Sequence, residues 1–61
     1  MSFTTQQKLD CAERELAIRL KVYSTRVAKG LMKEDVANHE INVMREIVYD
    51  YAMLAEKERR M

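Results

Sequence analysis

The stretch RVAKGLMKED, residues 26–35, decides how the chain folds. It contains Gly30, the only glycine among 61 residues, and the chain has no proline. A glycine here suits the left-handed conformation that follows many helix ends, and Leu31 after it suits the apolar contact of such an end. Glu34 and Asp35 then suit the positively polarised start of a second helix. The stretch therefore predicts a turn between two helices.

Helix-forming sequence extends on both sides of this turn. Before it, Thr4 followed by Gln7 matches the capping-box pattern that begins a helix, and no breaker interrupts residues 5–29. After it, residues 34–59 lead into a basic tail, which suits a helix C-terminus. The sequence therefore predicts an all-α fold, an antiparallel two-helix hairpin joined by residues 30–33.

Apolar residues recur at three- and four-residue spacing in both predicted helices. In the first helix they form one stripe: Leu9, Ala12, Leu16, Leu20, Tyr23, Val27 and Leu31. In the second helix they cover roughly half of the circumference, more than one neighbouring helix buries. We therefore expect the hairpin to dimerise into a four-helix bundle. The expected oligomer interface consists of Val36, Val43, Ile47, Tyr51 and Leu54.

Glu40 interrupts the apolar arc of the second helix. Antiparallel pairing places it level with Tyr23, and Arg19 and Arg26 lie one turn to either side. A carboxylate among apolar residues needs a partner, because an unpaired buried charge is costly. We predict a structural polar cluster in which the Glu40 side chain bonds Arg19, Arg26 or the Tyr23 hydroxyl.

A smaller apolar patch lies almost opposite the stripe of the first helix. It consists of Cys11, Ile18 and Val22, with Arg14 and Lys21 beside it. An apolar strip edged by basic groups suits an acidic amphipathic protein partner or a nucleic-acid backbone. A contact with a second subunit is an equally good interpretation. We expect these five residues to form a partner-binding surface.

Length and charge limit the class of protein. Residues 1–61 form one small domain, and a lone cysteine excludes an internal disulfide. The net charge is +1, with +3 in residues 1–30 and −2 in residues 31–61. Such halves suit an antiparallel pair, whereas nucleic-acid-binding proteins usually show a strong positive balance. No run is apolar enough for a membrane span and no signal-peptide pattern begins the chain, so we expect a cytoplasmic protein.

No catalytic or cofactor-binding motif is recognisable. His39, the only histidine, shares the outer face of the second helix with Asp35, Glu46 and Asp50. Closed metal sites need about four converging ligands, and a solvated polar face is the simpler interpretation. We therefore expect no enzyme activity, no cofactor and no bound metal.

The run CAERELAIRLKVYSTRVAKGLMKEDVANHEINVMREIVYDY, residues 11–51, resembles a group of short helical-hairpin proteins encoded by tailed phages and prophages. Their pattern is E-R-E-x-x-x-R-x-x-V-Y, then G-x-M, then A-x-x-E-I-x-x-M. The matching positions are Glu13, Arg14, Glu15, Arg19, Val22, Tyr23, Gly30, Met32, Ala37, Glu40, Ile41 and Met44. Those proteins often carry proline where Ser24 stands and threonine or serine where Lys33 stands, so we expect a straighter first helix and a second helix without its usual cap. The resemblance implies a phage or prophage origin and a place in the bacterial host cell, and brings no activity with it.

Two functions follow as hypotheses. The first is a non-enzymatic phage or prophage accessory protein, a homo-oligomeric helical hairpin that binds a host or phage protein. The alternative is an RNA-binding four-helix bundle that uses the basic face of the first helix. The basic residues of that face are Arg14, Lys21, Arg26 and Lys29.

Overall fold

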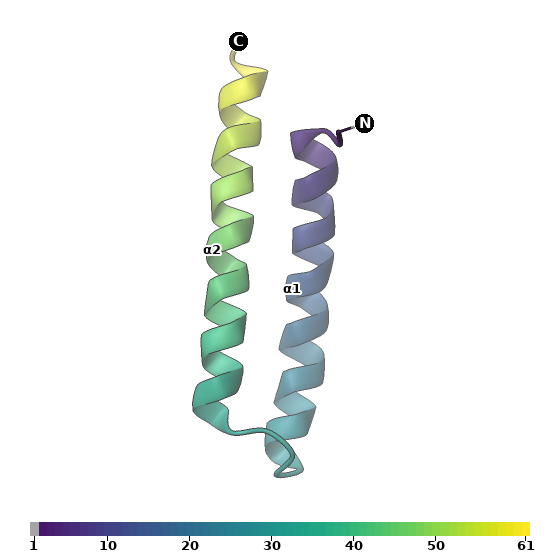
Figure 1. Cartoon of the computed structure of the whole chain (residues 1–61), viewed down its shortest axis with the longest axis vertical. Coiled ribbons are helices and arrows are strands. Elements are labelled where there is room, and N and C mark those ends of the chain that lie inside the picture. The colour runs from purple at the N-terminus through teal and green to yellow at the C-terminus, as the bar shows by residue number, and fades with distance from the viewer. Residues whose placement is uncertain (1) are drawn as a thin grey trace.

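The computed structural model describes residues 2–61 and contains two α-helices that pack side by side (Figure 1). Helix α1 spans Thr5–Ala28 and helix α2 spans Glu34–Arg59. The helices run in opposite directions, so both ends of the chain lie at the end of the hairpin remote from the turn. The longest dimension is 47 Å. The all-α, two-helix fold predicted from the sequence is confirmed, and its helix bounds agree to within one residue.

Helix α1 begins with the predicted capping box. The Thr4 hydroxyl accepts a hydrogen bond from the Gln7 backbone N–H at 3.1 Å, and the Thr4 N–H donates to the Gln7 side-chain oxygen at 2.9 Å. Each bond satisfies a backbone or side-chain group at the helix start. The start of α1 is therefore fixed by two residues that were recognisable in the sequence.

The turn uses Gly30 as predicted. Gly30 has a φ of 73°, the only positive φ in residues 2–61. Its N–H donates to the Val27 carbonyl at 3.0 Å, and the Leu31 N–H donates to the Arg26 carbonyl at 2.8 Å. This pair of bonds is the Schellman motif, which satisfies the last carbonyls of a helix. The apolar contact expected of Leu31 is absent, because that side chain is 74% exposed.

Helix α2 begins without a side-chain cap. Lys33 is the N-cap residue and its side chain makes no capping hydrogen bond. The Asp35 carboxylate accepts instead from the Val36 N–H at 2.9 Å. Glu34 and Asp35 both lie in the first turn, where a negative charge interacts favourably with the helix dipole. With lysine at the N-cap position, residue 33 supplies no side-chain cap to the first turn of α2.

The two helices meet along a narrow seam. The buried residues are Leu9, Ala12, Ala37, Met44 and Ala55. Half-buried residues continue the same lines: Leu16, Arg19 and Tyr23 in α1, and Ile41, Val48 and Tyr51 in α2. We call these eleven the seam residues. Successive seam residues in each helix are alternately three and four positions apart, as in a coiled coil. The core of the hairpin is therefore a single row of side chains from each helix.

The seam departs from the predicted stripe in the middle of α1. Leu20 was expected inside but is 41% exposed, whereas the Arg19 side chain is only 24% exposed. A straight helix drifts by about 20° per seven residues against a repeat of 3.5, and paired helices wind around each other to remove that drift. The next seam position after Leu16 is therefore Arg19 and not Leu20.

Candidate protein-interaction surface

Arg19 supplies the polar link between the helices. Its Nε–H donates to Glu15 Oε1 at 3.0 Å within α1, and its Nη1 donates to the backbone carbonyl of Glu40 in α2 at 3.0 Å. The bond to Glu15 is the main cause that raises the pKa of Arg19 above its ordinary value, against an opposing effect of burial. Arg19 therefore stays charged and holds one residue from each helix.

The predicted polar cluster takes a different form. Arg19 meets Glu40, but the acceptor is the backbone carbonyl and not the carboxylate. Among residues 2–61, neither Tyr23 nor Arg26 forms a side-chain hydrogen bond, and Arg26 is exposed. The physical reason is that Glu40 lies beside the seam and not in it. Its half-buried side chain reaches water, so it does not require a buried partner.

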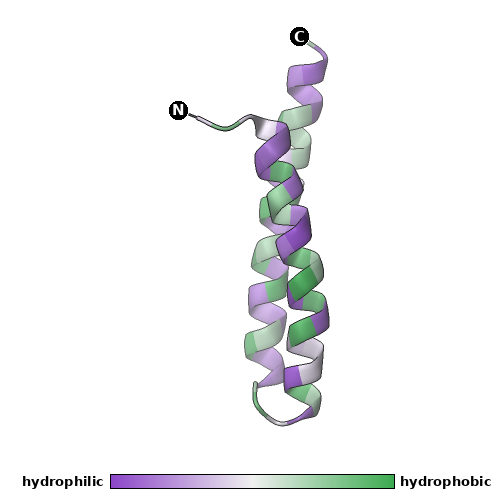
Figure 2. Cartoon of the chain, turned by 90° about the vertical axis from the view of Figure 1, so that its right-hand side faces the viewer, coloured by the Kyte–Doolittle hydropathy of each residue, from purple (hydrophilic) through white to green (hydrophobic). Residues whose placement is uncertain are grey.

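Much of the apolar side-chain surface remains outside the seam. Hydrophobic segments recur along the whole length of both helices, as Figure 2 shows. The exposed large apolar side chains are Phe3, Ile18, Leu20, Leu31, Val36, Val43, Ile47, Tyr49, Met53, Leu54 and Met61. Only two large apolar side chains, Leu9 and Met44, are buried among residues 2–61. The hairpin thus leaves far more large apolar side chains exposed than it buries.

Seven apolar residues share one side of the hairpin. Each stands one position before a seam residue, and in an antiparallel pair those positions of the two helices lie on the same side of the seam. We call this set the apolar face: Cys11, Ile18 and Val22 from α1, with Val36, Val43, Ile47 and Leu54 from α2. Lys8, Glu15, Glu40 and Asp50 occupy the remaining positions of that side.

A groove opens on the side of the hairpin that carries the apolar face. Its volume is about 650 Å³, and Cys11 of α1 lies across it from Ile47 and Tyr51 of α2. The other lining residues are Phe3, Gln7, Lys8, Ala12, Glu15 and Met44. Side chains from both helices therefore form one continuous surface near the open end of the hairpin.

The predicted partner surface and the predicted oligomer interface are thus brought together. The sequence placed Cys11, Ile18 and Val22 almost opposite the packed stripe of α1, on a face of their own. In the structure Cys11 lines the groove together with α2 residues, and Val22 is half-buried. The structure therefore places Cys11 of this patch beside residues of α2, and not on a separate face of α1.

The remaining predicted site residues lie at the margins of the apolar face. Arg14 and Lys21 are exposed on the outer edge of α1, two positions before the seam residues Leu16 and Tyr23. Tyr51 is itself a seam residue that reaches the groove.

Phe3 is a groove residue that the sequence analysis missed. It precedes the N-cap residue of α1 and is 72% exposed, yet it lines the groove. The available signal was an aromatic residue immediately before a capping box, where an apolar side chain often packs back on the helix.

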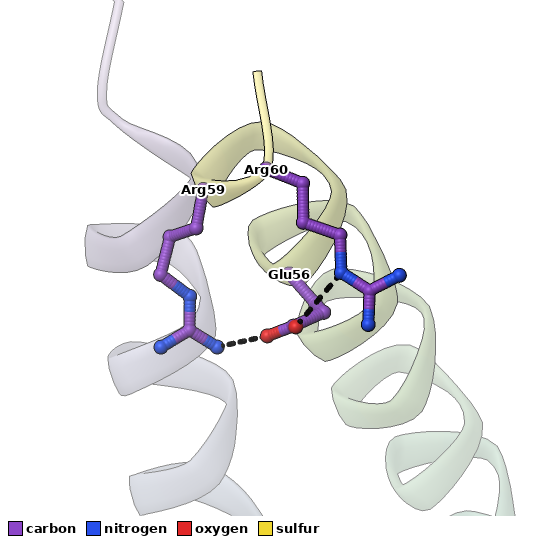
Figure 3. Close-up of polar contacts among 3 residues, drawn as sticks. All are labelled: Glu56, Arg59 and Arg60. Carbon is purple, nitrogen blue, oxygen red and sulfur yellow. Dashed lines mark hydrogen bonds and ion pairs between the residues drawn. The ribbon is translucent and has the colours of Figure 1, made fainter.

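Charge is unevenly divided between the helices. Helix α1 contains five basic and three acidic residues, and α2 contains three basic and seven acidic residues. Within residues 2–61 the ion pairs join Glu15 to Arg19 and Glu56 to both Arg59 and Arg60, all inside one helix. Figure 3 shows Glu56 between its two arginines at the end of α2. The opposite charges of the helices, expected to suit the hairpin, therefore form no ion pair across it.

A metal ion requires several ligand groups that converge on one point. No group of three or more His, Cys, Asp and Glu side chains in residues 2–61 is placed to hold a metal ion, and this includes the outer face around His39. Cys11 is a free, exposed thiol.

Neither α1 nor α2 contains an apolar stretch that could cross a membrane. Comparison of the chain with models of protein families, with curated proteins and with solved structures found no match.

Proposed function

We propose that the protein is a non-enzymatic interaction module whose hairpin self-associates through the apolar face into a dimeric four-helix bundle. The observation that carries the proposal is the imbalance between the seam and this face. Three of the five buried residues are alanines, while Val36, Val43, Ile47 and Leu54 remain exposed. Full burial of one Val, Leu or Ile side chain contributes about 1.5–3 kcal/mol.

Small size makes this burial important. Ordering a chain costs on the order of 1.5 kcal/mol per residue, and small chains commonly offset that cost by oligomerisation, a metal or disulfides. The lone Cys11 excludes an internal disulfide. A second hairpin laid on the apolar face adds buried area on both copies at once, because a two-fold interface uses the same surface twice.

The biological setting follows from the resemblance of residues 11–51 to hairpin proteins of tailed phages and prophages. On that basis the protein is an accessory protein of the infected or lysogenic bacterial cell, and it acts in the cytoplasm by binding a host or phage protein. Such a role requires a stable surface and no catalytic group.

RNA binding by the same bundle is the second candidate. It is favoured by the exposed basic residues of α1 and of the turn, which form no ion pair within residues 2–61: Arg14, Lys21, Arg26 and Lys29. Binding of this kind weakens steeply as salt rises, because each phosphate contact releases counterions. An affinity for RNA that does not change between about 50 and 200 mM salt excludes it.

Sedimentation equilibrium over a range of concentrations tests self-association. We expect a mass of twice 7.2 kDa for the natural sequence. Val43→Asp places a charge on the apolar face and should raise the dimer Kd at least tenfold. Tyr49→Asp is the matched control, because Tyr49 follows the seam residue Val48, lies on the other side and is 63% exposed. A monomer at all concentrations overturns the proposal.

A further inference from the structure

We infer how the two copies are arranged: α1 of each copy lies on α2 of the other, both turns are at the same end, and Arg14 of one copy lies between Glu46 and Asp50 of the other. This inference rests on the proposed self-association and specifies its geometry. It identifies the occupant of the apolar face as a second copy of this chain.

The dimensions of the apolar face fit a second hairpin. From Val36 to Leu54 the face is about 27 Å long at 1.5 Å per residue, and two helices of about 10 Å diameter give a width of about 20 Å. The flat footprint is therefore about 540 Å² per copy, or about 1,080 Å² for two copies. Side chains that protrude from this plane add further area. Specific interfaces bury at least about 1,000 Å² in total. A single helix seated in the groove covers only part of this width.

Charge distinguishes the two symmetric ways of stacking two hairpins face to face. The outer edge of α1 carries Arg14 and Lys21. The outer edge of α2 carries Glu46, and Asp50 lies next to it at the margin of the apolar face. Stacking α1 on α1 brings the two basic edges together and the two acidic edges together. Stacking α1 on α2 brings opposite charges together along both edges. Like charges in an interface are costly, so the second arrangement is favoured.

These four charges are available for a second copy. Arg14, Lys21, Glu46 and Asp50 form no ion pair within residues 2–61. Arg14 and Glu46 each stand two positions before a seam residue and so point away from the other helix of their own hairpin. They cannot pair inside one chain, whereas a stacked copy places one beside the other.

The register of the hairpin fixes which charges meet. Thr5 donates a hydrogen bond to the Glu58 carboxylate at 2.8 Å, and Arg19 donates to the Glu40 carbonyl at 3.0 Å. Between these two links, Arg14 is level with about position 46 of α2. With both turns at the same end, the same levels hold between copies. Arg14 then meets the acidic pair formed by Glu46 and Asp50, which are one helical turn apart.

A charge-swap cycle tests the ion pair. Arg14→Glu and Glu46→Arg should each raise the dimer Kd about tenfold, because each replaces two attractions per dimer with two repulsions. The double variant R14E/E46R should bind itself more tightly than either single variant. Arg45→Glu and Glu13→Arg are the controls for net charge, since both residues follow a seam residue and lie on the other side. A double variant no tighter than the single variants overturns the arrangement.

Cysteine cross-linking tests the stacking directly. In a Cys11→Ser background, Ile18→Cys and Val43→Cys place thiols on α1 and α2 within about 3 Å of the same level along the helix axis. We expect an oxidised mixture of the two variants to form a mixed covalent dimer, and neither variant alone to cross-link. Self-linking of Ile18→Cys, or no product in the mixture, overturns the arrangement.

The two proposals fail in different ways. A natural protein that sediments as a dimer but gives the wrong cross-links retains self-association and loses only the stacking of α1 on α2. A natural protein that is monomeric loses both.

Discussion

Arg19 of α1 donates to the backbone carbonyl of Glu40 in α2, and the two atoms are 3.0 Å apart. This bond and the one between Thr5 and Glu58 are the hydrogen bonds that join the helices within residues 2–61. Within α1, the Arg19 Nε–H donates a hydrogen bond to the Glu15 carboxylate, and this bond helps to orient the guanidinium toward α2. A backbone acceptor makes this contact independent of the Glu40 side chain.

Because the acceptor is the backbone carbonyl of Glu40, substitutions of Arg19 and of Glu40 should affect stability differently. Arg19→Lys should lower the free energy of unfolding by about 0.5–1.5 kcal/mol, because an ammonium cannot reproduce both guanidinium contacts. Glu40→Gln should change it by less than about 0.5 kcal/mol, because the carbonyl remains. Urea denaturation at one fixed protein concentration measures both. A large loss in Glu40→Gln indicates that the carboxylate, and not the carbonyl, is the partner.

The pKa of Arg19 predicts its effect on the pH dependence of stability. The pKa of Arg19 is raised above its ordinary value, chiefly by the hydrogen bond to Glu15. A group whose pKa is raised by folding stabilises the fold at every pH below its unfolded value and loses that contribution only as pH rises through the folded value. The guanidinium should therefore add no pH dependence between about pH 5 and 9. Denaturation midpoints of the natural protein and of Arg19→Lys should differ by the same amount across this range.

The capping box predicts a specific loss at the start of α1. Thr4→Ala removes the acceptor of the Gln7 N–H and should cost about 1 kcal/mol of stability, with lower helicity by circular dichroism. Thr25→Ala is the control, because the Thr25 hydroxyl only donates to the Lys21 carbonyl inside the helix. Thr25→Ala should be neutral or slightly stabilising, because alanine is the better helix former. An equal loss in both variants therefore contradicts a specific effect of capping.

Gly30 predicts a conformational cost without a steric one. A Cβ added at this position has no atom within 4 Å. Any loss of folding free energy in Gly30→Ala therefore comes from the φ of 73° alone. We expect a loss of about 1–2 kcal/mol. Gly30→Asn should lose less, since asparagine tolerates the left-handed region better. Thermal denaturation of the three proteins gives the order, and an alanine variant as stable as glycine contradicts it.

Local signals made most of the fold predictable. Thr4 with Gln7, the lone Gly30 and the uncapped Lys33 each act within one turn of helix, so their structures follow from a few neighbouring residues. The seam was less predictable because it depends on the winding of two helices. Leu20 is exposed where Arg19 is half-buried, and Cys11, expected on the back of α1, lines the groove together with residues of α2. The sequence therefore identified the apolar residues of the candidate site but separated residues that lie together.

Cys11 provides a natural probe of the apolar face. It is exposed in the single hairpin and lines the groove beside Ile47, so a second copy laid on that face covers it. Its reaction with a thiol reagent should therefore slow as protein concentration rises through the dimer Kd. In Val43→Asp, which disfavours the dimer, the rate should be fast and independent of concentration. Tyr49→Asp, altered on the other side, should behave as the natural protein does. A rate that is the same in all three proteins at every concentration contradicts coverage of the groove and moves the self-association surface elsewhere on the hairpin.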